Sequence, residues 1–335
     1  MGKTLVVTDI HLNNPRPGYL DAQVDHLLSI YDEEVPDDVV IMGDVFMYRK
    51  PSPSVLLGLR RLIAGFACRV WILRGNHDSE TKADDGVTAL SLFASDKVRV
   101  ITHTKTFDNW TFIPHYENEN KIKEALAGTP KGNTVFGHFG YDGCLNSAGD
   151  NDFNIGLSEF NNRTLLGHIH RFNNKSVEVE GVSTDVTLLG PPYCINFGDS
   201  GREFYYAVKE WDNDWVFKPS MGGIRHLVYD LEEVPDKLDI INDPSYFTHL
   251  RVFLDKLGTE NQHSLRDELL GICSVQQLDI KFRPVMDSAA MSSYRPDRNL
   301  FSINEAVIDD YIKSREISID KDDLLAGYRL SLIHI

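Results

Sequence analysis

The chain has 335 residues, 42% of them hydrophobic, and its 34 lysines and arginines face 50 aspartates and glutamates. This length exceeds the roughly 250 to 300 residues at which a single core stops growing, so a large domain and a smaller one are expected. The net charge of −16 argues against a protein that holds a polyanion by its own cationic surface. A nucleic-acid substrate would need bound divalent metals or a basic partner subunit.

Segment hydropathy and cysteine usage predict a cytoplasmic protein without a membrane partner. No stretch approaches the ~20 apolar residues of a membrane span. The first residues, MGKTLVVTDIH, contain Asp9 where a signal peptide needs an unbroken apolar core. The four cysteines are scattered without a C-x-x-C spacing, which argues against a disulfide framework or a thiolate zinc site. We expect buried free thiols.

Apolar runs and helix-like segments alternate in the first part of the chain. Runs rich in β-branched residues occupy 4–9, 37–44 and 69–76, and helix-like segments occupy 19–35 and 52–66. This order of strand, helix, strand, helix and strand predicts an α/β layer with largely parallel strands.

Later apolar runs follow one another with almost no helix between them. They read VRVIT, WTFIPH, NTVFGH, RTLLGHIH, VTLLG, FYYAVKEW and DWVFKPS. An α/β half followed by a β-rich half predicts two sheets packed face to face with helices outside, an α-β-β-α sandwich over residues 1–224.

The pattern changes after residue 224. The segments THLRVFLD, NQHSLRDELLGIC and VQQLDIKFRP predict a small β-α-β domain over residues 225–290. We assign residues 291–335 to a tether and a C-terminal helix, INEAVIDDYIKSRE, in which Ser302 and Glu305 form a capping box. One face of this helix carries an apolar stripe that either covers the chain's own core or docks in a partner's groove. The stripe consists of Ile303, Val307, Ile308, Tyr311 and Ile312.

Polar side chains follow five of the predicted strands directly after the apolar run, in the segments VVTDIH, IMGD, LRGNHD, FGH and LGHIH. The carboxyl ends of strands in an open α/β sheet are where ligands collect, so these side chains are expected to converge on one crevice. The candidate metal ligands are Asp9, His11, Asp44, Asn76, His138, His168 and His170. We interpret histidines 26, 226, 249, 263 and 334 as surface or packing residues. His115 ends a strand without a glycine turn, and we leave it out.

The donor set has a chemical meaning. Imidazole, carboxylate and amide oxygen without thiolate suit Mn²⁺, Fe²⁺ or Zn²⁺. Seven donors are too many for one tetrahedral ion. They suit two ions about 3.5 to 4 Å apart that share a bridging carboxylate, the arrangement that clamps attacking and leaving oxygens in phosphoryl hydrolysis. Each motif alone is common, and only the full ordered set favours this interpretation.

The order D-x-H, G-D, G-N-H-D, G-H and G-H-x-H resembles the calcineurin-like metallophosphoesterase family. The resemblance implies one metal held by Asp9, His11, Asp44 and His170, and another held by Asp44, Asn76, His138 and His168. Mn²⁺ is the expected ion, with Mg²⁺, Fe²⁺ and Zn²⁺ as alternatives. The resemblance also implies that a metal-bridging hydroxide attacks phosphorus in line, and that His77, oriented by Asp78, is the acid near the leaving group.

The remaining sequence favours a DNA nuclease within this family. The segments GDVFMYRK and GNHD differ from the G-D-x-V-D-R-G and G-N-H-E of protein phosphatases. Residues 188–214 resemble the nuclease subunits of SbcCD-type recombination and repair complexes, including the phage version, in which a strand pair closes the second sheet. The resemblance implies an exonuclease or endonuclease that binds DNA. It also implies that the C-terminal helix binds an SbcC-type ATPase, and it leaves a homodimer open. A phage-encoded chain would act in the host cytoplasm.

The loop after G-D raises the question of substrate. The resembled subunits often carry a histidine, associated with duplex ends, where this chain has Met47, while Arg49 and Lys50 are candidates for contacts to DNA phosphates. Two alternatives remain. A small-molecule phosphodiesterase or phosphatase would need a narrow pocket, and a DNA-end-binding scaffold would carry a vestigial site.

Overall fold

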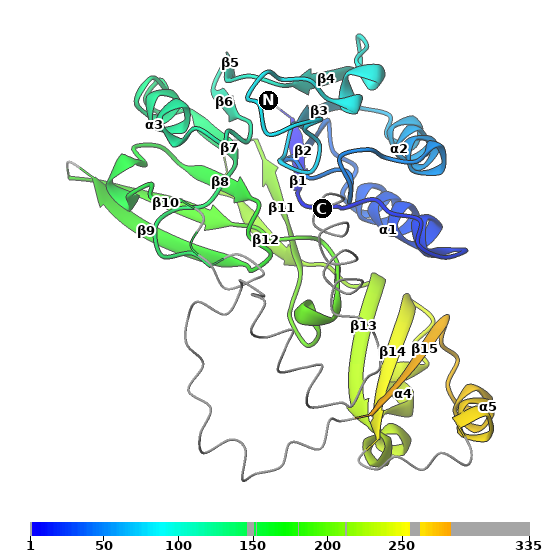
Figure 1. Ribbon diagram of the computed structural model, residues 1–335. Helices are drawn as coiled ribbons and strands as arrows, with labels where there is room; N and C mark the ends of the chain where they lie inside the picture. Colours follow the sequence, from blue (N-terminus) through cyan, green and yellow to red (C-terminus); the bar gives the residue numbers. More distant parts are fainter. Residues whose placement is uncertain are drawn as a thin grey trace, which may run out of the picture. The chain divides into compact units, whose positions relative to one another are not determined.

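The first sheet of the computed structural model follows the strand and helix alternation expected from the sequence (Figure 1). Its parallel strands lie side by side in chain order and are β1 (Lys3–Val7), β2 (Asp38–Ile41), β3 (Arg69–Leu73) and β4 (Val98–Ile101). The connections contain α1 (Tyr19–Glu34), α2 (Pro53–Gly65) and the 3₁₀ helix η1 (Ala89–Phe93). Both α-helices pack on one face of this sheet.

The strand pair that begins in the segment 188–214 joins this first sheet. Strand β11 (Tyr205–Glu210) runs antiparallel to β1, with Val6 opposite Ala207, and β12 (Val216–Pro219) pairs with β11. The expectation that this pair closes the second sheet was therefore wrong. Without β11, the outer edge of β1 would leave its backbone N–H and C=O groups unpaired. Strand β11 forms hydrogen bonds with these groups.

The second sheet has the order β5-β6-β7-β8-β10-β9. Its strands are β5 (Lys105–Phe107), β6 (Trp110–Ile113), β7 (Thr134–His138), β8 (Thr164–Gly167), β9 (Asn173–Val179) and β10 (Val182–Leu188). The helix α3 (Glu119–Ala127) covers its outer face, and two short 3₁₀ helices follow, η2 (Leu157–Glu159) and η3 (Phe197–Asp199). Helix α3 was not expected from the sequence. Its signals were Asn118, which caps the helix, and the buried pair Ile122 and Leu126 at i, i+4 spacing.

The two sheets pack face to face, as side-chain alternation along the strands requires. In β1 and β2, Val6 and Val40 point between the sheets, whereas their neighbours contact the helix layer. Trp71 of the first sheet stacks on Phe112 of the second, with ring centroids 5.3 Å apart. These contacts confirm the α-β-β-α sandwich.

A third sheet follows residue 222. Its parallel strands are β13 (Gly223–Asp230), β14 (Tyr246–Leu254) and β15 (Gln277–Phe282). The connections contain η4 (Leu231–Lys237), α4 (Leu238–Ile241) and α5 (Gln262–Ile272). The sheet packs on α1, where Phe247 meets Tyr19 with ring centroids 5.4 Å apart. The expected domain boundary between residues 224 and 225 falls near the start of β13.

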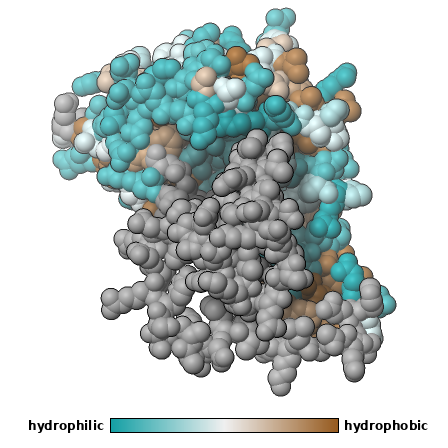
Figure 2. Space-filling view, viewed as in Figure 1, coloured by the Kyte–Doolittle hydropathy of each residue, from teal (hydrophilic) through white to brown (hydrophobic). Residues whose placement is uncertain are grey.

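The structure describes residues 2–145, 151, 153–179, 181–211, 213–254 and 262–282. All of them belong to one unit, Met1–Arg283, and the expected C-terminal helix lies outside the described residues. All four cysteines are free, and three of them are buried as expected, whereas Cys68 is only half-buried. The visible face of the described part is mostly hydrophilic over α3 and β5 (Figure 2). Among these residues, none of the helices combines the length and the apolar character that a membrane crossing needs.

Candidate metal centre

Four of the candidate ligands have a left-handed backbone directly after their strands. The φ angles are 51° at Asp9, 39° at His11, 47° at Asp44 and 81° at His168. Such angles are uncommon for residues with a side chain and persist where surrounding contacts enforce them, often at functional sites. Here the β1 and β2 ends are tied together, because Asp9 N donates to Gly43 O at 3.0 Å and His11 N donates to Asp44 O at 2.9 Å.

Glycines allow these strand ends to approach one another closely. A Cβ atom at Gly75 would lie 2.2 Å from Asp44 Oδ1 and 2.3 Å from Asp44 N, and one at Gly43 would lie 2.4 Å from His138 Nδ1. Side chains at either position would push the candidate ligands apart. The glycine in L-R-G-N-H-D is therefore required by the approach of β2 to β3, beyond its role in a turn.

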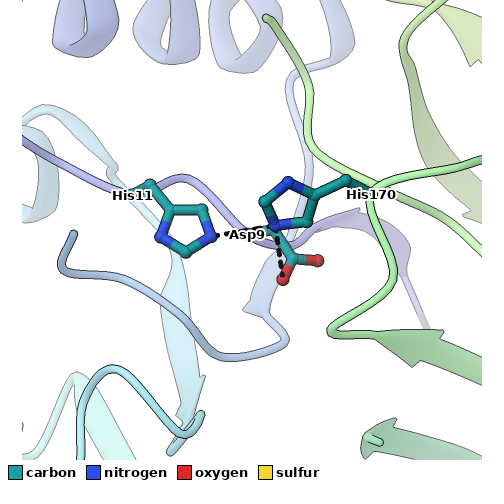
Figure 3. A group of neighbouring side chains, drawn as sticks. All are labelled: Asp9, His11 and His170. Atoms are coloured by element: carbon teal, nitrogen blue, oxygen red, sulfur yellow. Dashed lines mark hydrogen bonds and ion pairs between the residues drawn. The ribbon is translucent and has the colours of Figure 1, made fainter. Parts of the chain in front are cut away.

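The first group of candidate ligands consists of Asp9, His11 and His170, whose side chains point toward one another (Figure 3). The His11 and His170 Nε2 atoms are 3.1 Å apart, and His170 Nε2 lies 3.9 Å from Asp9 Oδ1. They arrive from β1 and from the turn after β8, 159 residues apart in the case of the two histidines. All three are buried or half-buried.

The second group consists of Asp44, His138 and His168, with Asn76 between them. The Asn76 side-chain oxygen lies 3.2 Å from His138 Nε2 and 2.9 Å from His168 Nδ1. His138 Nδ1 donates to Met42 O at 2.6 Å, which leaves Nε2 to face the group. Metal-binding imidazoles commonly have their second nitrogen held in this way.

Asp44 faces both groups with a different oxygen. Its Oδ2 lies 3.7 Å from His11 Nε2 in the first group, and its Oδ1 lies 3.3 Å from His138 Nε2 in the second. The carboxylate is buried. This is the geometry that a carboxylate shared by two cations requires.

Strong electrostatic coupling marks the same residues. Burial by itself raises the pKa of the Asp44 carboxyl, but the charges of His138 and then His11 hold it well below its usual range. Burial lowers the pKa of His138, yet the Asp44 carboxylate outweighs it and raises that pKa to about 9. Burial lowers the pKa of His11 to about 4, against the attraction of Asp44.

The donors present fit divalent cations. The Asn76 amide can take two orientations: with its nitrogen toward the group it donates to Asp44 at 3.2 Å, and with its oxygen toward the group it offers a ligand atom. Together with the carboxylates and imidazoles, it completes an oxygen-and-nitrogen donor set without thiolate, which suits Mn²⁺, Fe²⁺ or Zn²⁺.

His77 and Asp78 have different surroundings from those expected. His77 Nδ1 donates to Met47 O at 2.7 Å, and its ring meets the His11 ring edge-on at 5.0 Å. Asp78 accepts from Phe46 N and Gly75 N at 3.0 and 2.8 Å. Asp78 thus stabilises the turn through backbone N–H groups. The hydrogen bond that orients the His77 ring goes to Met47 O, although Asp78 was expected to orient it. Burial, followed by the Asp44 charge, raises the pKa of Asp78 to about 6.

The two expected DNA-contacting residues lie on the loop after Asp44. Arg49 donates to Ser79 O and Thr81 O at 3.1 and 2.8 Å, which fixes its guanidinium beside the centre. Lys50 is exposed. The structure therefore brings Arg49 to the edge of the site and leaves Lys50 on the surface.

Three residues next to the centre were not expected from the sequence. His115 stacks on His168 with centroids 5.6 Å apart, and burial lowers its pKa to about 3. Arg74 is buried and donates to His115 O and Ser79 Oγ, which links β3 to the end of β6. Asp199 of η3 lies behind His170. The position of His115 at a strand end could have been recognised from the sequence. For Arg74 and Asp199, the neighbouring residues in the sequence give no such indication.

Histidines 26, 226 and 249 agree with the packing roles expected of them, while His334 lies outside the described residues. His26, His226 and His249 are buried. His26 pairs with Ser220 Oγ at 2.8 Å, and the rings of His226 and His249 pack against Phe197.

Comparisons with known proteins place this centre in a family. The sequence profile described as calcineurin-like phosphoesterase matches residues 2–172, just over half of the chain. No curated protein matches. Among solved structures, the chain is similar to the crystal structure of the Pseudomonas putida nuclease MPE. The identity is 16%, 60% of this chain and 83% of that chain are covered, and the TM-score is 0.32. The profile covers every candidate ligand, and the chain belongs to the calcineurin-like phosphoesterase family of metal-dependent hydrolases.

Proposed function

We propose that this chain is a DNA phosphodiesterase that uses two divalent ions, with Mn²⁺ as the preferred ion. The observation that carries the proposal is the position of Asp44, whose two oxygens face two separate groups of ligands. One ion would be held by Asp9, His11, Asp44 and His170, and the other by Asp44, Asn76, His138 and His168.

The protein's own residues have distinct tasks in this hydrolysis. A pair of divalent ions lowers the pKa of water and neutralises charge on the phosphate. His77 would protonate the departing oxygen. Its Nδ1–H is used on Met47 O, so the catalytic proton has to sit on Nε2, and the active acid is the imidazolium form. Met47 contributes through its carbonyl, a group that any residue at this position would supply.

DNA is favoured over other phosphodiesters by two features. The sequence of residues 188–214 resembles the corresponding segment of nuclease subunits. The third sheet contains β14, α5 and β15 in the order of the β-α-β unit expected from the sequence, with β13 as an additional strand. With a net charge of −16, the chain needs its bound cations or a basic partner to attract DNA. Action in the cytoplasm stays part of this proposal.

The decisive experiment compares nucleic-acid and small substrates in one assay. Purified protein is incubated with Mn²⁺ or Mg²⁺ and end-labelled single-stranded, duplex and hairpin DNA, alongside bis-p-nitrophenyl phosphate. Cleavage of DNA supports the proposal and also reveals strand preference. Cleavage of the small ester alone favours a small-molecule phosphodiesterase, a candidate that the modest cavity beside His168, about 280 Å³, also suits. Binding of DNA ends without hydrolysis would indicate a scaffold with an inactive centre.

The partner proposal rests on sequence alone. The apolar stripe of the expected C-terminal helix, from Ile303 to Ile312, would dock on an SbcC-type ATPase. Removal of residues 300–335 should spare hydrolysis of the small ester and abolish co-purification with the ATPase. A truncated chain that binds the ATPase with undiminished affinity would contradict the docking proposal.

A further inference from the structure

We propose that the cavity beside the second ligand group binds one nucleoside unit of the substrate, next to the phosphodiester that is cut. This inference rests on the proposed function and names the part of the substrate that the site recognises. The cavity has a volume of about 280 Å³. Asn76 and His168 line it together with Arg49, Lys82, His115 and Glu117.

The position of the cavity fixes what it can hold. Asn76 and His168 belong both to the cavity wall and to the second ligand group. A phosphate held at that group would therefore carry one of its two ester substituents directly into the cavity. The cavity is thus placed to select that substituent.

The inner wall suits a flat aromatic ring. His115 is 7% exposed and stacks on His168 with an interplanar angle of 30°. Phe153 meets both rings edge-on, with centroids 5.2 Å from His168 and 6.0 Å from His115. Within the described part of the chain, His115 Nδ1 has no hydrogen-bond partner. A buried polar atom without a partner is costly, so a ligand group that reached this nitrogen would gain stability.

The outer wall of the cavity contains both positively and negatively charged side chains. The guanidinium of Arg49 is fixed by two backbone carbonyls, and its Nη2 lies 3.9 Å from Glu117 Oε1. His115 Nε2 lies 3.8 Å from the same oxygen. Lys82 is exposed at the opening. Bases present donors and acceptors along one edge, which Glu117 and His115 can meet, while Lys82 and Arg49 attract the adjoining phosphate.

The volume decides between one nucleotide and a duplex. Small-molecule pockets span roughly 300–1,000 Å³, so about 280 Å³ leaves room for a single base with its sugar and not for a base pair. A paired base would have to leave its partner before it could enter, at a cost of a few kcal/mol. The substrate class is therefore a strand whose nucleotide at the cut is unpaired.

The test compares two esters that release the same coloured product. In both thymidine 5′-(p-nitrophenyl phosphate) and bis-p-nitrophenyl phosphate, water adds to phosphorus, the P–O bond breaks and p-nitrophenolate leaves. Only the first carries a nucleoside. Wild type should show a higher kcat/KM for the nucleoside ester. Lys82→Ala and Glu117→Gln should lower the ratio of the two kcat/KM values at least fivefold.

Matched controls and a second readout keep the test specific. Lys131→Ala, at the opposite end of β7, and Glu124→Gln, on the exposed side of α3, should leave the ratio unchanged. Calorimetric titration with thymidine 5′-monophosphate should show the same loss of affinity in the two cavity variants. An unchanged ratio in both cavity variants, or no preference in wild type, would overturn the cavity proposal alone. Failure of wild type to cleave either ester or DNA would overturn the proposed function.

Discussion

The Nδ1 atom of His170 lies 4.0 Å from Oδ2 of Asp199, a buried carboxylate that η3 brings behind the metal centre. Asp199 accepts from Arg202 Nη1 at 2.7 Å, and the same nitrogen donates to His170 O at 3.3 Å. Two residues earlier, Phe197 contacts the third sheet, where the Arg251 guanidinium lies 3.6 Å from its ring centroid. The orientation of His170 is thus connected to a segment 30 residues further along the chain.

Asp199→Asn should weaken binding of Mn²⁺ by about 10- to 100-fold, because the variant loses a buried negative charge that lies behind a candidate metal-binding imidazole. Isothermal titration with Mn²⁺ measures this change. Asp185→Asn alters a carboxylate that pairs with Arg163 and Ser176, and it serves as the control with unchanged affinity. Equal affinities in wild type and Asp199→Asn would restrict Asp199 to a structural role.

His77→Ala should abolish hydrolysis of DNA, whose departing alkoxide oxygen needs a proton, and leave the metal content nearly intact. The ring is next to the ligands and is held by Met47 O, without belonging to either ligand group. General acid catalysis contributes typically 10²- to 10⁴-fold, which sets the expected loss of rate. Elemental analysis of the variant decides the assignment, since loss of metal would make His77 a ligand.

Asp44→Ala should leave less than one tightly held ion per chain. Removal of the carboxylate that faces both groups would leave two cations repelling each other without the anion between them. Metal content after dialysis, determined by elemental analysis, tests this expectation. Two ions at full occupancy would exclude a shared role for Asp44.

Gly75→Ala should destabilise the fold by about 4 kcal/mol or more, because the new Cβ would meet the backbone nitrogen of Asp44 at 2.3 Å. Gly271 offers a matched control, since a Cβ there has nothing within 4 Å. In α5, Gly271→Ala should stabilise by about 0.5–1 kcal/mol. Urea unfolding of both variants measures the difference, and similar stabilities would show that β2 and β3 can separate without cost.

Acid should destabilise the protein partly through His26, whose pKa is lowered to about 4 by burial. The unfolded state, with an imidazole pKa near 6.5, binds the proton more readily, so stability is full above that pH and falls below it. The loss through His26 reaches about 2 kcal/mol by pH 5 and continues toward pH 4. His26→Gln should remove this part. Unfolding free energies of wild type and variant at pH 7.5 and pH 5 test it, and parallel pH profiles would contradict it.

The pattern of neighbouring residues was enough to predict most of the strands and the alternation of strands and helices in the first sheet. It was also enough to predict which polar side chains follow the strands. Apolar runs with β-branched residues form strands because burial favours them there, and a polar residue directly after such a run comes to the carboxyl edge of its sheet. Asp9, Asp44 and His138 were found in this way, each from a few neighbouring letters. The short helix α3 left a weaker signal, because only Ile122 and Leu126 are buried in it.

Tertiary structure decided what depends on residues far apart in the chain. The contact of His170 with Asp199, the link from Arg74 to His115 and the pairing of β11 with β1 join segments whose sequences carry no mark of one another. Asp78 likewise holds its own turn while Met47 holds His77. These contacts form because buried polar groups need hydrogen-bond partners when the two sheets pack together. The available partners depend on which segments are neighbours in the folded structure, and the local sequence does not determine this.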